Sequence, residues 1–290
     1  MHPLPARTRS PVWLLLVPLV LIGLSLALTA AVDLYNVFGL REVVADRSLF
    51  PFLWFSLFHW LQVLQWPVGG VVILLCGINA GLAWQAGRQR ARLMHLVLGA
   101  GMVLMLVEDA GDVRHLIRIY VNRALLADLG DFSPLIIMIE LAYFAAIAAV
   151  MLYALGRFWR VWWPHVAARI GFLTGIGCYA LATGSSWLGH ALRGRFEEYP
   201  DLYTLVGTYV LKAVYWLAPG YREILEKDPD LIYGTPVQFV VMDHVYEESV
   251  ELIGAFGLLV GVVAMLLVLL APARPAGAAA DTDHGRTEHP

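Results

Sequence analysis

Two apolar stretches of the chain carry carboxylate and imidazole groups at helical spacing. In the first, Glu108, Asp112 and His115 stand at positions i, i+4 and i+7, which share one face of an α-helix. In the second, the same kinds of group recur in reverse order, as His244, Glu247 or Glu248, and Glu251. If the two helices are antiparallel neighbours, equivalent groups meet at equal depth in the bilayer.

Such a set of groups could bind a metal ion. Helical bundles hold metals with carboxylate-x-x-His pairs on facing helices, and imidazole with carboxylate suits Zn, Mn or non-haem Fe. The expected divalent cofactor would serve a membrane hydrolase or oxidoreductase acting on a lipid or a periplasmic small molecule. The expected metal ligands are Asp112, His115, His244, Glu247 and Glu248.

Three further carboxylates are candidates for general acid–base catalysis beside that metal. Glu108 and Glu251 belong to the two patterns above, and Glu140 lies about two turns into an apolar helix. A carboxylate at that depth must be paired, protonated or in contact with water. We therefore expect Glu108, Glu140 and Glu251 to act in catalysis if the protein is an enzyme.

A non-enzymatic alternative accounts for the same acids. Arg114 and Arg118 follow the first pattern directly and could neutralise its carboxylates and those of the second pattern in a buried ion-pair network. The acids would then serve the structure, ion handling or the docking of a partner. The sequence leaves both interpretations open, and it identifies no protein partner.

Composition defines the class of protein. The chain has 290 residues, of which 59% are hydrophobic and only 15% are charged, so we expect an integral membrane protein. The formal net charge of −3 gives no reason to expect a nucleic-acid partner. Cys76 and Cys178 lie in apolar runs and predict buried side chains without a disulfide.

The apolar runs predict an all-α bundle with about six membrane spans, in one domain that covers residues 1–271. A bilayer core requires about 20 apolar residues per helix. We expect the second span to bend at Pro67, the third helix to continue past its acids toward Leu126, and the sixth helix to begin after Pro236. The expected apolar spans are 12–32, 52–85, 93–107, 135–155, 170–190 and 250–270.

Charge distribution predicts the orientation. The short loops on one side carry Arg without Asp or Glu, so the positive-inside rule places both termini in the cytoplasm, in a bacterial inner membrane. Residues 191–236 would form an outer cap, in which 202–217 is interfacial or a seventh span, and 272–290 a disordered cytoplasmic tail. Glycines four residues apart, Gly171/Gly175 and Gly257/Gly261, predict close helix packing.

Overall fold

A computed structural model describes residues 10–47, 52–111, 113–125, 134–192, 201–227 and 236–271. Asp112 lies outside the described residues, as do some side chains within helices, among them those of Arg114, His115, Arg118 and His190. The regular secondary structure of the described residues is entirely helical. The expectation of an all-α protein is thus confirmed.

Among the described residues, six helices are long and apolar enough to cross a membrane: Pro11–Leu34, Leu53–Gln85, Gln89–Gly111, Leu135–Arg157, Val166–Gly189 and Val237–Leu270. They correspond in order to the elements α1 (Leu16–Thr29), α3 (Leu53–Gln85), α4 (Gln89–Gly111), α6 (Pro134–Arg157), α8 (Val166–Ala191) and α12 (Glu248–Leu270). The prediction of six spans in a multi-pass membrane protein is confirmed. The shorter α9 (Leu202–Leu217) is not among them.

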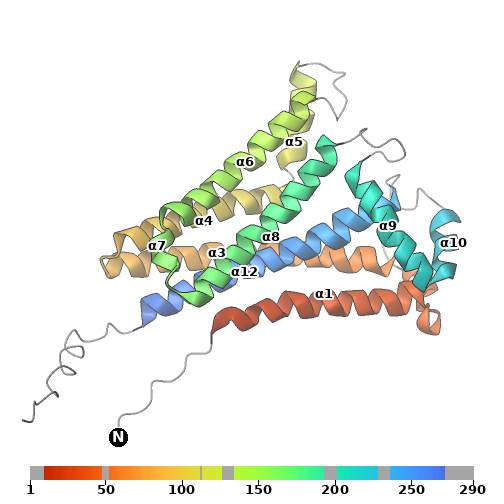
Figure 1. Ribbon diagram of the computed structural model, residues 1–290, viewed down its shortest axis with the longest axis horizontal. Coiled ribbons are helices and arrows are strands. Elements are labelled where there is room, and N and C mark those ends of the chain that lie inside the picture. The colour runs from red at the N-terminus through yellow and green to blue at the C-terminus, as the bar shows by residue number, and fades with distance from the viewer. Residues whose placement is uncertain are drawn as a thin grey trace, which may run out of the picture.

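Helix α12 lies at the centre of the bundle, between α3 and α8 (Figure 1). In the most apolar 18-residue window of the sixth span, Val237–Leu270, 61% of the residues are buried. In the corresponding window of the first span, Pro11–Leu34, only 17% are buried. A helix that is apolar on all sides belongs in the interior of a bundle. Helix α1 instead lies at the edge, against α3 and α12.

Small residues bring α8 and α12 into close contact. A Cβ atom added to Gly257 would lie 2.5 Å from the backbone nitrogen of Gly175, and one added to Gly175 would lie 2.6 Å from Leu258. The two backbones approach this closely because glycine has no side chain. The close packing predicted from the glycine spacing is confirmed.

Helices α3 and α4 form an antiparallel hairpin. Helix α3 ends at Gln85; in the turn that follows, Gly87 has a φ of +67°, in the left-handed region, and the Arg88 N–H donates to the Ala83 carbonyl at 2.7 Å. The register follows from Gly99, where an added Cβ would lie 3.2 Å from the Cβ of Cys76. Pro67 lies inside α3, which is assigned as one helix of 33 residues, or about 50 Å.

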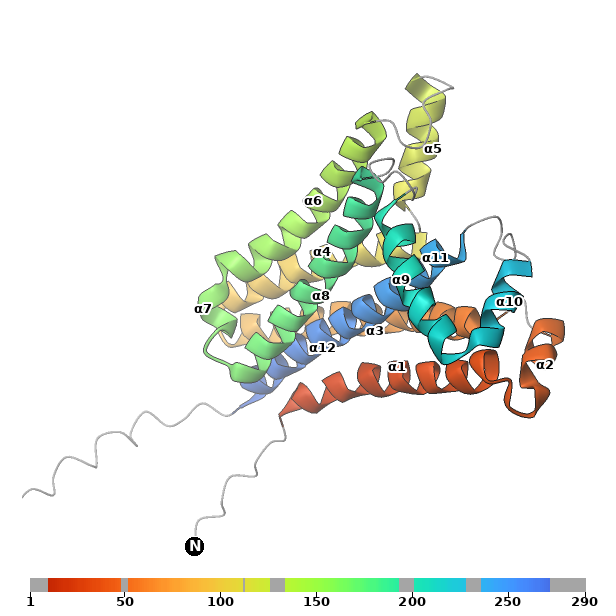
Figure 2. The ribbon, with the colours of Figure 1, turned by 45° about the vertical axis from the view of Figure 1, so that its right-hand side comes forward.

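The third helix does not continue as one straight rod. Helix α4 ends at Gly111 and α5 (Val113–Leu125) follows in a different direction, as Figures 1 and 2 show. Glycine is a poor helix former and weakens the helix at this point. The described residues are thus helical on both sides of residue 112, in two segments that differ in direction.

In the part of the chain that the structure describes, two segments of the spans are π-helical. They are η2 (Ala30–Leu34) at the end of the first span and η4 (Val241–Glu247), which joins α11 (Val237–Val240) to α12. The sixth helix thus begins after Pro236 as expected. A π-helical turn holds more residues than an α-helical turn, so the three-residue spacing of His244 and Glu247 does not put these two side chains on one face.

Asp33, in η2, caps the start of α3 from the neighbouring span. Its carboxylate accepts hydrogen bonds from the Leu53 N–H at 3.1 Å and the Trp54 N–H at 2.8 Å, and its side chain is fully buried. The first N–H groups of a helix have no partner within the helix. Asp33 satisfies two of them and fixes the first span against α3.

Short helices complete the fold. They are η1 (Pro11–Leu15), η3 (Val37–Gly39), α2 (Leu40–Arg47), α7 (Trp159–Trp162) and α10 (Pro219–Lys227). Helix α9 packs against α11 and η4. A Cβ on Gly207 of α9 would collide with the Gln238 carbonyl of α11, so glycine permits this contact.

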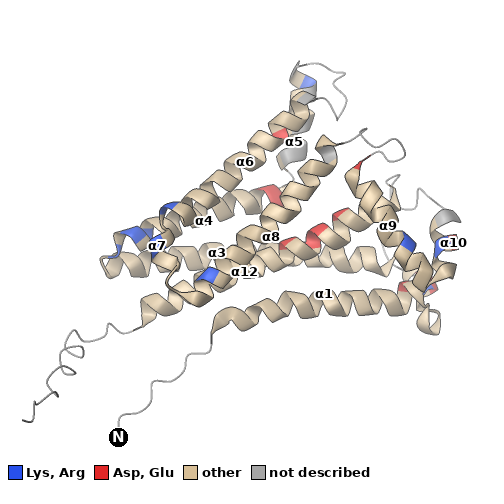
Figure 3. Cartoon of the chain, in the orientation of Figure 1, with Lys and Arg blue, Asp and Glu red and all other residues tan. Residues whose placement is uncertain are grey.

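Charge divides the bundle into two ends (Figure 3). We call the basic end the one that holds Arg88, Arg90, Arg92, Arg157, Arg160 and Arg169, whose segments 84–92, 155–170 and 262–271 contain no Asp or Glu. We call the opposite one the acidic end. It holds the acids of η2, of the end of α4, and of η4 and the start of α12, together with basic residues on α9 and α10: Asp33, Glu108, Asp109, Asp243, Glu247, Glu248, Lys212 and Arg222.

Candidate functional site

Glu248, the first residue of α12, is held by α3. Its side chain is 7% exposed, and Gln65 Nε2 donates to the Glu248 carboxylate at 3.0 Å and to the Glu248 carbonyl at 3.3 Å. Since both partners of this nitrogen are acceptors, the orientation of the Gln65 amide is defined. The other amide atom, Gln65 Oε1, is buried and has no hydrogen-bond partner among the described residues.

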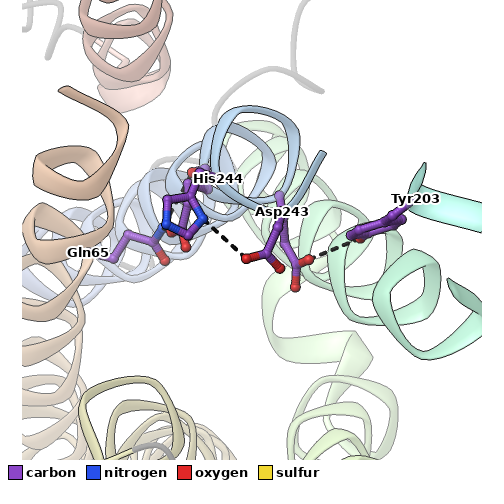
Figure 4. A network of polar contacts seen from close by, with 6 residues as sticks. Gln65, Tyr203, Asp243 and His244 are labelled. Atoms are coloured by element: carbon purple, nitrogen blue, oxygen red, sulfur yellow. Dashed lines mark hydrogen bonds and ion pairs between the residues drawn. The ribbon is translucent and has the colours of Figure 1, made fainter. Parts of the chain in front are cut away.

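Glu247 is held by a different helix. The Tyr203 hydroxyl of α9 donates to the Glu247 carboxylate at 3.0 Å (Figure 4), and it lies 3.1 Å from the Ser185 hydroxyl of α8. Burial, followed by the nearby Glu247 charge, raises the pKa of Tyr203 well above its ordinary value. The protonated hydroxyl therefore links α8, α9 and the start of α12.

His244 contacts a third set of neighbours. Its Nδ1 lies 3.1 Å from the Asp243 carboxylate, and its ring centroid lies 4.4 Å from that of Phe55 on α3. Figure 4 shows the His244 ring on the α3 side and Tyr203 on the opposite side of the same helix. His244 and Glu247 of η4 thus contact different helices, α3 and α9, on opposite sides of this segment.

The described part of the predicted metal-ligand set does not converge. Among the described residues, no group of three or more His, Cys, Asp or Glu side chains could hold a metal ion. Of the expected ligands, His244, Glu247 and Glu248 have the separate partners given above. Asp112 and the His115 side chain lie outside the described residues, so a metal site that includes them stays a prediction, as does the ion pairing by Arg114 and Arg118.

Glu108 and Glu251, two of the three predicted catalytic carboxylates, line the same cavity of about 320 Å³. Asp109 is the third carboxylate in its wall, and Gln65 and Tyr179 also line it. Glu140 is buried on α6 with 8% exposure but is not part of this lining. The structure therefore brings Glu108 and Glu251 together and leaves Glu140 apart.

Apart from its carboxylates, the cavity has mostly apolar walls from α4, α6, α8 and α12. They include Met102, Met105, Leu141, Phe144, Ile147, Met151, Leu152, Ile176 and Leu258. Leu152 and Ile176 also line an adjoining groove of about 440 Å³, which continues to Trp159, Trp163 and Phe172 near the basic end. From Gly184 to Phe172 on α8 the two spaces cover about 18 Å.

The carboxylates around this cavity interact electrostatically. Glu248 experiences the charges of Glu251, Asp109, Glu247 and Asp243, in that order of size. The Tyr143 hydroxyl of α6 donates a hydrogen bond to Glu108. Where these carboxylates are ionised, their charges are weakly screened inside a bilayer, so this end favours a positively charged group.

Several residues of the site were missed by the search for helical spacing. Asp109 stands next to Glu108 but off the i, i+4, i+7 pattern, and Gln65 lies in an aromatic-rich stretch that also holds Ser56, His59 and Gln62. Tyr203 is far away in the sequence. A polar residue in an otherwise apolar span was the available signal for Gln65.

Comparison of the chain with protein-family models, with curated proteins and with solved structures found no match. The fold and composition define the class: a multi-pass, α-helical membrane protein with a carboxylate-lined cavity between its spans.

Proposed function

We propose that this protein binds an amphipathic ligand with a positively charged, hydrogen-bond-donating head group, such as a long-chain amine. The supporting observation is the cavity that Glu108, Asp109, Glu251 and Gln65 line together with mostly apolar side chains. Ionised carboxylates only accept hydrogen bonds, so the complementary head group is a donor.

The cavity and the adjoining groove suit an apolar chain attached to that head. Their extent of about 18 Å along α8 exceeds the thickness of one leaflet, about 15 Å, which is half of a typical hydrocarbon core. A chain as long as those of the surrounding lipids would lie along α6 and α8. Its head would lie at the acidic end, which we propose faces the outer side of an inner membrane, in line with the positive-inside rule.

Carboxylates at the head end also offer groups that exchange protons with a bound molecule. Glu108 and Glu251 are the acid–base residues that we propose for a reaction on the ligand, if the ligand is a substrate. The segment that contains α9 would cover this end, since Tyr203 of α9 bonds Glu247 of the central helix.

The test uses the full-length protein in nanodiscs of phosphatidylcholine. Binding of dodecylamine is measured by isothermal titration, with dodecanol as the uncharged comparison. We expect saturable binding of the amine alone, and at least tenfold weaker binding to Glu251→Gln and Asp109→Asn, since each loses a charged acceptor. Asp243→Asn, which removes an acid outside the cavity lining, is the matched control and should bind normally.

Equal binding of dodecanol, or equal weakening by Asp243→Asn, would overturn the amine proposal. Elemental analysis of the same samples tests the rival metal prediction. Stoichiometric Zn, Mn or Fe that is lost in a folded His115→Ala/His244→Ala variant would support metal-dependent chemistry in place of amine binding.

A further inference from the structure

A second cleft, of about 410 Å³, lies at the basic end, away from the carboxylate-lined cavity. Its polar wall is formed by Arg88, Gln89 and Arg90 from the α3–α4 turn and the first turn of α4, with His165 from the segment after α7. Its apolar wall is formed by Val161 of α7 and by Met265, Val268 and Leu269 near the end of α12.

The backbone places the two arginines at this cleft. Gly87 takes a left-handed conformation that only glycine adopts easily, and the Arg88 N–H closes the turn on the Ala83 carbonyl. Helix α4 begins directly afterwards, at Gln89. The N–H groups of its first turn therefore add a partial positive charge beside the guanidinium groups.

Other arginines at the basic end are engaged with tryptophan. The guanidinium groups of Arg92, Arg160 and Arg169 lie over the rings of Trp84, Trp159 and Trp163, at 5.2, 5.7 and 5.2 Å from the centroids. Arg88 and Arg90 instead face the cleft as exposed side chains. No Asp or Glu occurs in the segments 84–92, 155–170 and 262–271 that form this end.

We propose that this cleft binds an anionic phospholipid. Arg88, Arg90 and the first turn of α4 would hold the phosphate group, and an acyl chain would lie against Val268, Leu269 and Met265. Basic clefts that adjoin apolar helix surfaces are suited to anionic lipids, since they offer charge for the head and contact for the chain. A free phosphate ion would use only the polar wall.

The lipid proposal is tested on the full-length protein by native mass spectrometry. The protein is released from detergent with dioleoylphosphatidylglycerol or dioleoylphosphatidylcholine at matched concentrations. We expect the anionic lipid to remain bound preferentially and to bind at least tenfold more weakly to Arg88→Gln/Arg90→Gln. Arg88→Lys/Arg90→Lys keeps both positive charges and should retain most of the preference for the anionic lipid. This result would show that the weaker binding of the Gln variant does not come from a loss of folding.

The matched control is Arg160→Gln/Arg157→Gln, which removes two positive charges from the same end but outside the cleft. It should leave the lipid preference unchanged. Equal weakening by this control would overturn the proposal in favour of diffuse attraction by the basic surface. Equal retention of the two lipids, or competition by inorganic phosphate at the same concentration as the lipid, would also overturn it.

Discussion

The close contact between α8 and α12 predicts a large effect from adding a single methyl group. In Gly257→Ala, the new Cβ would lie 2.5 Å from the Gly175 nitrogen, 2.9 Å from Gly175 Cα and 3.0 Å from the Gly171 carbonyl oxygen. All three are backbone atoms of α8, so no side-chain rotation relieves the clash. The two helices must move apart.

The size of the effect follows from that movement. To reach an ordinary separation of 3.4 Å from the nearest atom, the helices must separate locally by about 0.9 Å. A gap of this size forfeits a quarter to a half of each van der Waals contact along the interface. We expect a cost of about 1–3 kcal/mol, as for other overpacked interiors.

The matched control is Gly177→Ala on α8. Gly177 is exposed and an added Cβ meets nothing within 4 Å. Both variants gain the same higher helix propensity of alanine, up to about 1 kcal/mol, so the difference between them isolates the clash. The free energy of unfolding is measured in mixed micelles by increasing the SDS fraction and following tryptophan fluorescence. If Gly257→Ala unfolds at the same SDS fraction as Gly177→Ala, the packing argument is refuted.

Two further substitutions test the acidic end. Asp33→Ala removes the acceptor for the Leu53 and Trp54 N–H groups and should lower the free energy of unfolding by about 1–3 kcal/mol. Asp33→Asn keeps one acceptor oxygen and should lower it by less. Equal losses for the two variants in the SDS titration would contradict the capping role of Asp33. Tyr203→Phe should change how the free energy of unfolding depends on pH. The pKa of Tyr203 is raised in the folded protein, so the contribution of its protonated hydroxyl to stability is complete below about pH 10 and is lost as the pH rises further. The wild type should therefore lose stability relative to Tyr203→Phe between pH 9 and pH 11, and parallel curves over this range would disprove the assignment.

Much of the fold could be predicted from the sequence because hydrophobicity and glycine spacing are local properties. Runs of about 20 apolar residues must span a bilayer as helices, since backbone groups in lipid are satisfied only within a helix or a closed barrel. The spacing of glycines along each helix is also local, so Gly171, Gly175 and Gly257 indicated a helix interface before any partner helix was known. The central position of α12 agrees with its nearly complete lack of polar residues after Glu251.

The site was only partly predictable because it depends on local helix type and on which helices are neighbours. Spacing arguments assumed 3.6 residues per turn, and the π-helical segment 241–247 breaks that period where His244 and Glu247 lie. Glu108 and Glu251 do line one cavity, although nothing in their spacing required α4 and α12 to share it with α6 and α8.

The sequence by itself determined the class of protein, the number of spans and the separation of acidic from basic ends, since each follows from the transfer of side chains between water and lipid. Tertiary structure alone decided which partner each carboxylate has: Gln65 for Glu248, Tyr203 for Glu247, and the Leu53 and Trp54 N–H groups for Asp33. These partners come from other helices, and hydrogen bonds depend on distances of about 3 Å that no pattern along one helix specifies.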